Sequence, residues 1–327
     1  MRGSLMRRWT EREHKEILGT HPCDGDAAAA YNESGRATVS RQLVRYWRTV
    51  FIENDGKLAS ADRFLKEQRV FIKPQPDDDF GDVSFIPETA ESILVIPDMH
   101  APYHHPDTIP FLVAVRDHFN PDLNVCLGDE TDFHALSFHD SDPNLDSAGA
   151  ELEKAKGFLA ELHDEFPELL VCHSNHGSMV YRRAKAHGIP VQAIKRYRDV
   201  LFPESGCPGW SWAYGWRIGT PMGTVMFKHQ ASGVLSEAAH NSCNLIVGHQ
   251  HGNFGVEYAA SSAHLYYAGH AGCLIDKDAL AFAYGKHSVK KPIIGCMVIL
   301  NGKPVPIPMV LDEEVRWRGT QIGRAHV

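Results

Sequence analysis

Five short apolar segments of this chain each end in side chains of the kind that bind metal ions. The segments are residues 93–97, 123–127, 169–173, 224–228 and 245–247. Residues 93–97 form a continuous apolar run, as in a strand that is buried on both faces of a sheet. The polar side chains that follow them are Asp98 and His100, Asp129 and Asp132, Asn175 and His176, His229, and His249 and His251. Strand carboxyl ends in an open α/β sheet converge on one crevice, so we expect these side chains to form one site.

Helical patterns separate these strands and indicate the α/β class. The predicted helices are residues 108–119, 150–166 and 235–241. Strands that alternate with helices are typical of layered α/β folds. Residues 292–310 predict a β-hairpin around Asn301 and Gly302, because Asn-Gly favours a type I′ turn. We assign residues 92–320 to this main domain.

The first 55 residues predict a small helical domain. Residues 1–50 carry nine Lys and Arg against six Asp and Glu, although the net charge of the whole chain is −8. Thr10 and Glu13 have the spacing of a capping box, residues 25–34 fit a short helix, and residues 38–51 fit an amphipathic helix. This order resembles a helix-turn-helix, whose last helix would enter the major groove of DNA. The alternative is a helical cap on the main domain, with its arginines in solvent.

Two further segments lie outside these domains. Residues 56–91 contain proline, glycine and a run of aspartates without periodicity, so they are interpreted as a linker or an edge strand. Residues 321–327, QIGRAHV, read like translated sequencing-adapter DNA. We exclude them from the fold prediction as an artefact.

Charge and composition narrow the range of partners and locations. A net charge of −8 gives no general attraction to nucleic acid or to an anionic membrane. The chain has no apolar run of the roughly 18 residues that a membrane span needs, and no secretory signal. Its seven cysteines are scattered without a CxxC pair, as in reduced proteins. We therefore expect a cytoplasmic protein without a membrane partner, and its oligomeric state stays open.

The types of side chain at the strand ends indicate the class of metal. Carboxylates, an amide oxygen and imidazoles suit Mn²⁺, Fe²⁺, Zn²⁺ or Ni²⁺, and the lack of a thiolate argues against a structural zinc site. One aspartate between two such sets can bridge two ions roughly 3.5–4 Å apart. That arrangement activates a water molecule and holds a phosphate.

The ordered set DxH, GDxxD, NH, H and GHxH, within about residues 92–270, resembles the calcineurin-like metallophosphoesterase family, of phage or bacterial type. The resemblance implies a four-layer αββα sandwich of two mixed sheets flanked by helices. It also implies a centre of two divalent ions, with manganese favoured and iron, zinc or nickel as alternatives. The implied ligands are Asp98, His100 and His251 for the first ion, Asn175, His229 and His249 for the second, and Asp129 for both.

The same resemblance implies a mechanism. A hydroxide held between the ions would attack phosphorus in line. His176 would face the leaving group, as a general acid or as a stabiliser of transition-state charge. Asp132 would hydrogen-bond His176, fix its tautomer and raise its pKa.

The chain departs from the usual family motif GNH[DE], which is Ser174-Asn175-His176-Gly177 here. The serine replaces a glycine in the turn that aims Asn175, and Gly177 replaces a carboxylate. Loss of such a supporting group typically lowers metal affinity or activity about 10–100-fold. For the second ion, His240 and His270 are weaker rivals of His229.

A basic and aromatic stretch precedes His229. Its basic residues include Arg182, Arg183, Lys195 and Arg196, and residues 210–216 read WSWAYGW. Basic residues beside aromatic ones can hold a phosphate backbone and stack bases. The alternative is a solvated helix face followed by a half-buried strand, because WSWAYGW alternates with a period of two.

These observations together predict an enzyme, a metal-dependent phosphoric ester hydrolase. We interpret it as a phosphodiesterase or nuclease, with DNA or RNA as the favoured substrate. One alternative is a phosphomonoesterase that acts on small molecules or nucleotides. A second alternative is a DNA-binding protein whose phosphoesterase domain is inactive.

Overall fold

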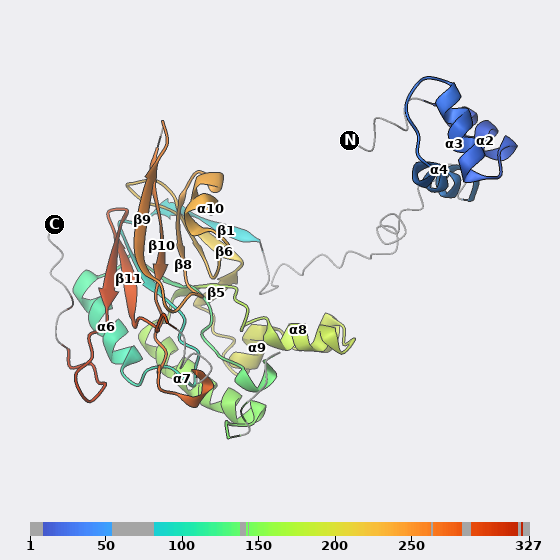
Figure 1. The fold of residues 1–327 in the computed structure, drawn as a ribbon. Helices are drawn as coiled ribbons and strands as arrows, with labels where there is room; N and C mark the ends of the chain where they lie inside the picture. Colours follow the sequence, from blue (N-terminus) through green and yellow to red (C-terminus); the bar gives the residue numbers. More distant parts are fainter. Residues whose placement is uncertain are drawn as a thin grey trace. The chain divides into compact units, whose positions relative to one another are not determined.

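The computed structural model describes residues 9–53, 82–137, 142, 144–262, 264–282, 289–319 and 322. The chain divides into two compact units, Met1–Gln75 and Pro76–Val327. The smaller unit is helical and the larger unit contains two β-sheets (Figure 1). No described helix is both long and apolar enough to cross a membrane.

The smaller unit is built from α2 (Glu11–Thr20), α3 (Asp24–Glu33) and α4 (Arg41–Arg48), which continues into a π-helical segment, Thr49–Glu53. The predicted capping box is confirmed: the Thr10 hydroxyl accepts a hydrogen bond from the Glu13 backbone, and the Glu13 carboxylate accepts one from the Thr10 backbone. Aromatic rings fill the core, where Tyr31 and Trp47 are fully buried. The apolar stripe of residues 38–51 therefore faces inward.

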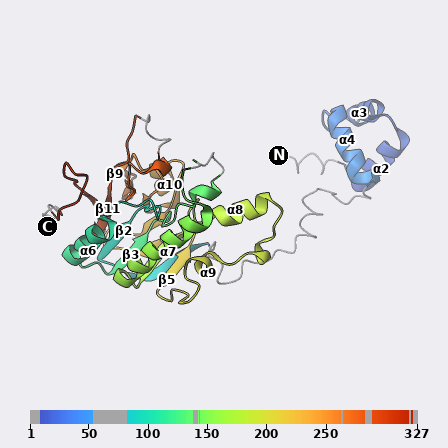
Figure 2. The ribbon, with the colours of Figure 1, turned by 90° about the horizontal axis from the view of Figure 1, so that it is seen from below.

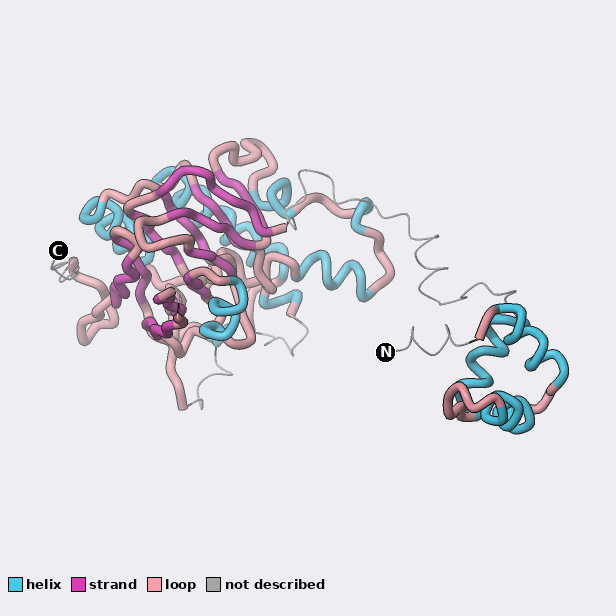
Figure 3. The backbone as a smooth tube through the Cα atoms, turned by 90° about the horizontal axis from the view of Figure 1, so that it is seen from above, coloured by secondary structure: helices cyan, strands magenta, loops and turns pink. Residues whose placement is uncertain are grey.

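Each of the two sheets of the larger unit has six strands and mixes parallel with antiparallel pairs. The first sheet contains, in spatial order, β12 (Lys303–Pro308), β11 (Gly295–Leu300), β2 (Ser92–Ile96), β3 (Leu123–Cys126), β4 (Leu169–Cys172) and β5 (Trp210–Ala213). The second contains β1 (Val83–Thr89), β6 (Gly215–Gly219), β7 (Val225–Lys228), β8 (Asn244–Val247), β10 (Leu265–Ala271) and β9 (Phe254–Ala260). Figure 3 shows the strands of both sheets in magenta.

Helices cover the outer face of each sheet. On the first sheet, α6 (Thr108–Phe119) and α7 (Ala148–Glu165) pack apolar side chains against β2, β3 and β4 (Figure 2). On the second sheet, α10 (Val234–Asn241) buries Ala238 against β8. Val95 and Phe227 belong to a third cluster, which fills the space between the sheets. The predicted four-layer αββα sandwich is thus confirmed.

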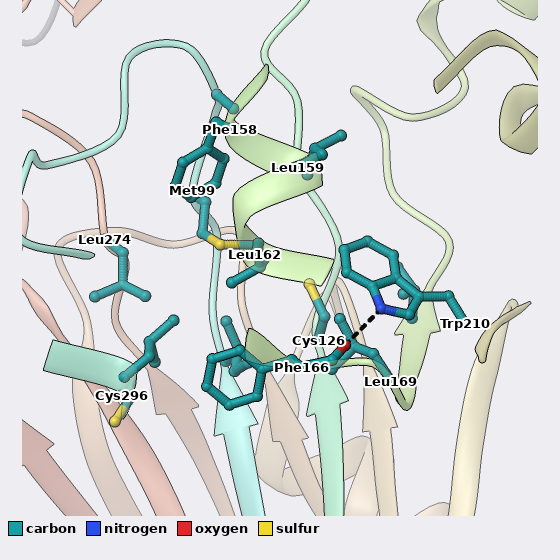
Figure 4. Packing of buried hydrophobic residues seen from close by; sticks show 14 of the residues in the cluster. Met99, Cys126, Phe158, Leu159, Leu162, Phe166, Leu169, Trp210, Leu274 and Cys296 are labelled. Atoms are coloured by element: carbon teal, nitrogen blue, oxygen red, sulfur yellow. Dashed lines mark hydrogen bonds between the residues drawn. The ribbon is translucent and has the colours of Figure 1, made fainter. Parts of the chain in front are cut away.

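The cluster under α7 shows how the first sheet is held to its helices. Figure 4 shows Phe158 and Leu162 of α7 beside Met99 and Cys126, all of them buried. The indole nitrogen of Trp210 donates a hydrogen bond of 2.8 Å to the carbonyl oxygen of Phe166, just after α7 (Figure 4). Burying a large apolar side chain contributes about 1.5–3 kcal/mol. This packed core therefore fixes the positions at which the strands of the first sheet end.

Shorter helices lie in the connections of the first sheet. His134–Leu136 follows β3, and three helices lie between β4 and β5: α8 (Met179–Ala186), Val191–Ala193 and α9 (Tyr197–Leu201). The predicted hairpin is also confirmed, because β11 pairs antiparallel with β12 and the turn residues Asn301 and Gly302 have φ angles of 49° and 80°. Two positive φ angles are those of a type I′ turn. All seven cysteines are free thiols.

The main sheet region begins earlier than residue 92. Part of the segment assigned to a linker or edge strand, Val83–Thr89, is β1, which pairs in parallel with β6 at the edge of the second sheet. Most of its side chains are exposed or half-buried, so it lacks the apolar run that marked the central strands. Residues 56–81 of that segment lie outside the described residues, as does the stretch assigned to adapter sequence, apart from Ile322.

Candidate metal centre

The side chains predicted at the strand ends meet between the two sheets. Asp98, Asp129 and Asn175 follow the parallel strands β2, β3 and β4 of the first sheet. His229 and His249 follow the parallel strands β7 and β8 of the second sheet. Because all five strands end on the same side, their loops bring these side chains to one place.

The first group of side chains consists of Asp98, His100 and His251. The Nε2 atom of His251 lies 3.2 Å from Asp98 Oδ2 and 3.1 Å from Nε2 of His100. One ligand atom from each residue lies within 4.8 Å of the others. Asp98 Oδ1 is buried and has no hydrogen-bond partner among the described residues.

The second group consists of Asp129, His229 and His249, with Asn175 beside it. Nε2 of His229 lies 3.2 Å from Nδ1 of His249 and 2.7 Å from Oδ1 of Asn175. Asn175 supplies an amide oxygen, which suits a hard divalent ion better than a soft one.

Asp129 belongs to the second group and also lies next to the first. Its Oδ2 atom is 3.4 Å from Nε2 of His100 in the first group and 3.2 Å from Nε2 of His229 in the second. Its Oδ1 atom accepts a hydrogen bond of 3.1 Å from the backbone N–H of His176. A carboxylate in this place can contact ions held by both groups.

The tautomers of two histidines fit a metal centre. Nδ1 of His100 donates to Asp132 Oδ1 at 2.6 Å, and Nδ1 of His229 donates to the carbonyl oxygen of Leu127 at 3.0 Å. With a proton on Nδ1, each ring turns its Nε2 atom toward the centre, where Nε2 can bind a metal ion once it carries no proton. Neighbouring lone pairs repel each other unless a cation or a proton lies between them, so this donor set fits divalent ions.

Electrostatics within the centre favour a positive charge there. Burial alone would lower the pKa of His229, but the carboxylates of Asp129 and Asp98 outweigh burial and raise it to about 9. Burial would raise the pKa of Asp129, yet His229 and His176 hold it well below its usual range. Binding of a cation would displace the proton that His229 carries.

The structure corrects the predicted partner of His176. The Asp132 carboxylate accepts its short hydrogen bond from His100, and its Oδ1 atom is 3.6 Å from Nδ1 of His176. Nδ1 of His176 donates instead to the main-chain carbonyl of Asp132. Although burial lowers the pKa of His176, Asp129 and Asp132 outweigh that effect and raise it. Asp132 therefore positions His100, and it acts on His176 only through charge and its backbone.

The backbone of the centre contains conformations that side chains rarely adopt. His100, Asp129 and His249 have φ angles of 53°, 50° and 65°. Each such residue costs on the order of 1–2 kcal/mol, and strained positions cluster at functional sites. Glycine is required beside them, because a Cβ atom at Gly248 would overlap Asp98 Oδ1.

The two departures from the family motif contact each other. The Ser174 hydroxyl accepts a hydrogen bond of 3.0 Å from the backbone N–H of Gly177. A Cβ atom at Gly177 would lie 3.2 Å from the same hydroxyl, which is tighter than ordinary contact. The serine thus closes the turn that carries Asn175 and His176, and glycine at position 177 leaves it room.

Sequence reasoning missed part of the surroundings of the site. A cavity of about 510 Å³ adjoins Asn175, His229 and His249, and Lys228 and Tyr214 are among its lining residues. Lys228 is the last residue of an otherwise apolar strand and pairs with Glu237 of α10, a contact that spacing alone does not reveal. The rival histidines His240 and His270 belong to none of the three metal-type groups found among the described residues.

The aromatic stretch before His229 is largely packing. Residues 210–216 contribute to the successive strands β5 and β6, which belong to different sheets, as the alternation predicted for a strand. Trp210 and Trp216 are 0% and 6% exposed, so neither ring is available to a base. Tyr214 differs, because 45% of it is exposed.

No protein-family model matches the chain, and no curated protein matches it. Three solved structures are similar to it in fold. One is an archaeal phosphodiesterase, with 12% identity, a TM-score of 0.34, and 69% of this chain and 97% of that chain covered. The second is Vps29 from Chaetomium thermophilum, with 13% identity, a TM-score of 0.36, and 71% of this chain and 94% of that chain covered. The third is vacuolar protein sorting 29 from Cryptosporidium parvum, with 13% identity, a TM-score of 0.34, and 67% of this chain and 96% of that chain covered. Likeness at this level carries no argument about activity.

Proposed function

We propose that the chain is a phosphoesterase that hydrolyses phosphodiester bonds in nucleic acid with two divalent metal ions, manganese being favoured. The observation that carries this proposal is the position of Asp129 between two groups of metal-type ligands. Asp98, His100 and His251 would hold one ion, and Asn175, His229 and His249 the other. Two ions at such a centre lower the pKa of a water molecule and neutralise charge on a phosphate.

The chain's own residues would orient the ligands and the leaving group. Asp132 and the carbonyl of Leu127 keep the Nδ1 protons of His100 and His229, so that each Nε2 atom stays available. In hydrolysis, a water oxygen bonds to phosphorus, the ester bond to the leaving oxygen breaks, and that oxygen takes up a proton. His176 is suited to give that proton, because its pKa is raised and its side chain is 20% exposed beside the centre.

The proposal is tested by comparing three substrates with the full chain in Mn²⁺. These are an aryl phosphomonoester, an aryl phosphodiester and single-stranded DNA. We expect turnover of the diester and of DNA, and we expect Asp129→Asn to reduce it to the uncatalysed level because the shared ligand loses its charge. Asp164→Asn, the same change at an exposed position on α7, is the matched control and should leave turnover unchanged.

The other outcomes distinguish the two alternative functions. Turnover of the monoester alone would make the chain a phosphomonoesterase. No turnover and no bound metal, measured by elemental analysis after dialysis against Mn²⁺, would make the larger unit an inactive phosphoesterase domain. Either result would overturn the proposed phosphodiesterase.

We also propose that the smaller unit binds double-stranded DNA through α4. The exposed residues of α4 are Arg41, Gln42, Arg45 and Tyr46, and Thr49 follows on the same side just after the helix. Arg48 is excluded from this role, because its side chain is only 20% exposed and donates to Asp24 and to the carbonyl oxygens of Leu18 and His21. Arg45 also pairs with Asp24, but 83% of its side chain is exposed. The exposed side chains lie along one side of the helix, as expected of a helix that contacts phosphates and base edges.

A further inference from the structure

The cavity beside the second group of ligands has walls that the proposed hydrolysis does not use. Asn175, His229 and His249 form the wall next to the metal centre. Arg182 of α8, Tyr214 between β5 and β6, and Lys228 of β7 come from elsewhere in the fold. Its volume of about 510 Å³ lies within the roughly 300–1,000 Å³ of small-molecule sites. A phosphate at the centre would therefore have space beside it for one of its ester groups.

The position of the cavity selects which ester group enters it. His176, the residue suited to protonate the leaving oxygen, is not among the described residues that line the cavity. An in-line displacement places the leaving group opposite the attacking water. The ester that stays on phosphorus therefore points neither toward the water nor toward the leaving group. The cavity is thus placed to receive the ester that stays on phosphorus.

The charge of the lining suits a phosphorylated ligand. Arg182 and Lys228 contribute cations, and the described lining residues include no carboxylate. The Lys228 side chain is 11% exposed, and Glu237 holds its ammonium group in place. An ammonium has three N–H donors, so one contact to Glu237 leaves donors for phosphate or sugar oxygens.

Tyr214 supplies a flat face beside this charge. It is 45% exposed, whereas Trp210 and Trp216 of the same stretch are buried. The Lys228 ammonium lies 5.3 Å from the centre of the Tyr214 ring, within the range of a cation–π contact. An exposed ring beside a cation is the combination with which proteins stack a base and hold its phosphate.

We propose that this cavity binds the nucleoside that remains attached to the scissile phosphate, with its base stacked on Tyr214 and its sugar or next phosphate held by Lys228. Stacking of a base on an exposed aromatic ring is typical of single-strand recognition, so we expect the substrate to enter as a single strand. This inference rests on the proposed phosphodiesterase activity and specifies its substrate.

Two chromogenic substrates with the same leaving group test the inference: methyl p-nitrophenyl phosphate, and thymidine 5′-(p-nitrophenyl phosphate). They differ only in the retained ester. With the full chain in Mn²⁺, we expect Tyr214→Ala to raise KM for the thymidine ester roughly 10-fold. Its kcat for that ester, and both constants for the methyl ester, should stay within about 2-fold.

Two further variants distinguish loss of base stacking from a general loss of structure or activity. Tyr214→Phe keeps the ring and should keep the wild-type KM for the thymidine ester. Tyr258→Ala, which removes another exposed tyrosine, on β9, is the matched control and should leave both substrates unaffected. Unchanged turnover of the methyl ester would establish that Tyr214→Ala is folded.

The outcomes distinguish this inference from the proposed activity. If wild type hydrolyses both esters but Tyr214→Ala leaves the ratio of their KM values unchanged, the nucleoside site is wrong and the phosphodiesterase stands. The same conclusion follows if Tyr214→Ala lowers turnover of both esters by the same factor while Tyr214→Phe does not. If wild type hydrolyses neither ester, the proposed activity itself fails.

Discussion

Asp132 accepts a hydrogen bond of 2.6 Å from His100, and the two side chains are 4% and 3% exposed. In such a buried pair the carboxylate fixes which ring nitrogen carries the proton and makes the other nitrogen a better ligand. Burial lowers the pKa of His100, so its ring is neutral before any ion binds. Asp132 therefore contributes to metal binding through a residue that it positions.

We predict that Asp132→Ala weakens binding of the first ion roughly 10–100-fold, because His100 loses the partner that orients it. Calorimetric titration of metal-free protein with Mn²⁺ measures both sites in one experiment. His176→Ala is the control: it should lower turnover and leave both affinities unchanged. Equal affinities in wild type and Asp132→Ala would contradict the role of Asp132.

Residue spacing located Asp132 but could not choose its partner. The DxxD spacing after β3 puts this carboxylate in a loop within reach of His100, His134 and His176. A choice among three histidines depends on rotamers and on the positive φ of Phe133, 54°, which sets the course of the loop. Likewise, the contact between Ser174 and Gly177 follows from a turn, not from residue types.

At the scale of elements, the central strands were predictable because both of their faces are buried. All five residues of β2 are buried, and the sequence shows this directly as an apolar run. The edge strand β1 has only one neighbour, β6, and its side chains are mostly exposed or half-buried. Such a strand is defined by its pairing partner, more than 120 residues away in the chain, and not by its own pattern.

The helix α4 carries a prediction of its own. We expect Arg41→Ala with Arg45→Ala to weaken binding of the full chain to duplex DNA and to lower the slope of log K against log salt by roughly 1–2, because two phosphate contacts are lost. Fluorescence anisotropy at several salt concentrations measures both quantities. Arg12→Ala with Lys15→Ala removes the same charge from α2 and is the matched control.

A result in which both double variants change binding equally would contradict this role for α4. It would mean that only the net charge of the smaller unit matters. If neither variant changes binding, duplex DNA contacts some other part of the chain.

At the scale of the whole molecule, the metal centre joins the two sheets of the larger unit. Asp98 and Asp129 come from the first sheet, and His229 and His249 come from the second. Asp98, Asp129 and Asp132 bury their carboxylates there. Burying like charges together is unfavourable unless positive charge is supplied, so bound ions should stabilise the larger unit. The smaller unit has an aromatic core of its own, and none of its described residues belongs to the groups of metal-type ligands.

We therefore predict that Mn²⁺ stabilises the larger unit alone. An ion at 100 times its Kd contributes about 2.7 kcal/mol, which for a domain of this size corresponds to roughly 5–10 °C in Tm. Calorimetry of the full chain measures this shift, and Asp129→Asn should reduce it. Hydrogen exchange resolved by peptide should slow at the ends of β2, β3 and β8 and stay unchanged in α2, α3 and α4. Equal slowing in those helices would mean that metal binding is coupled to the smaller unit, because exchange protection reports local stability.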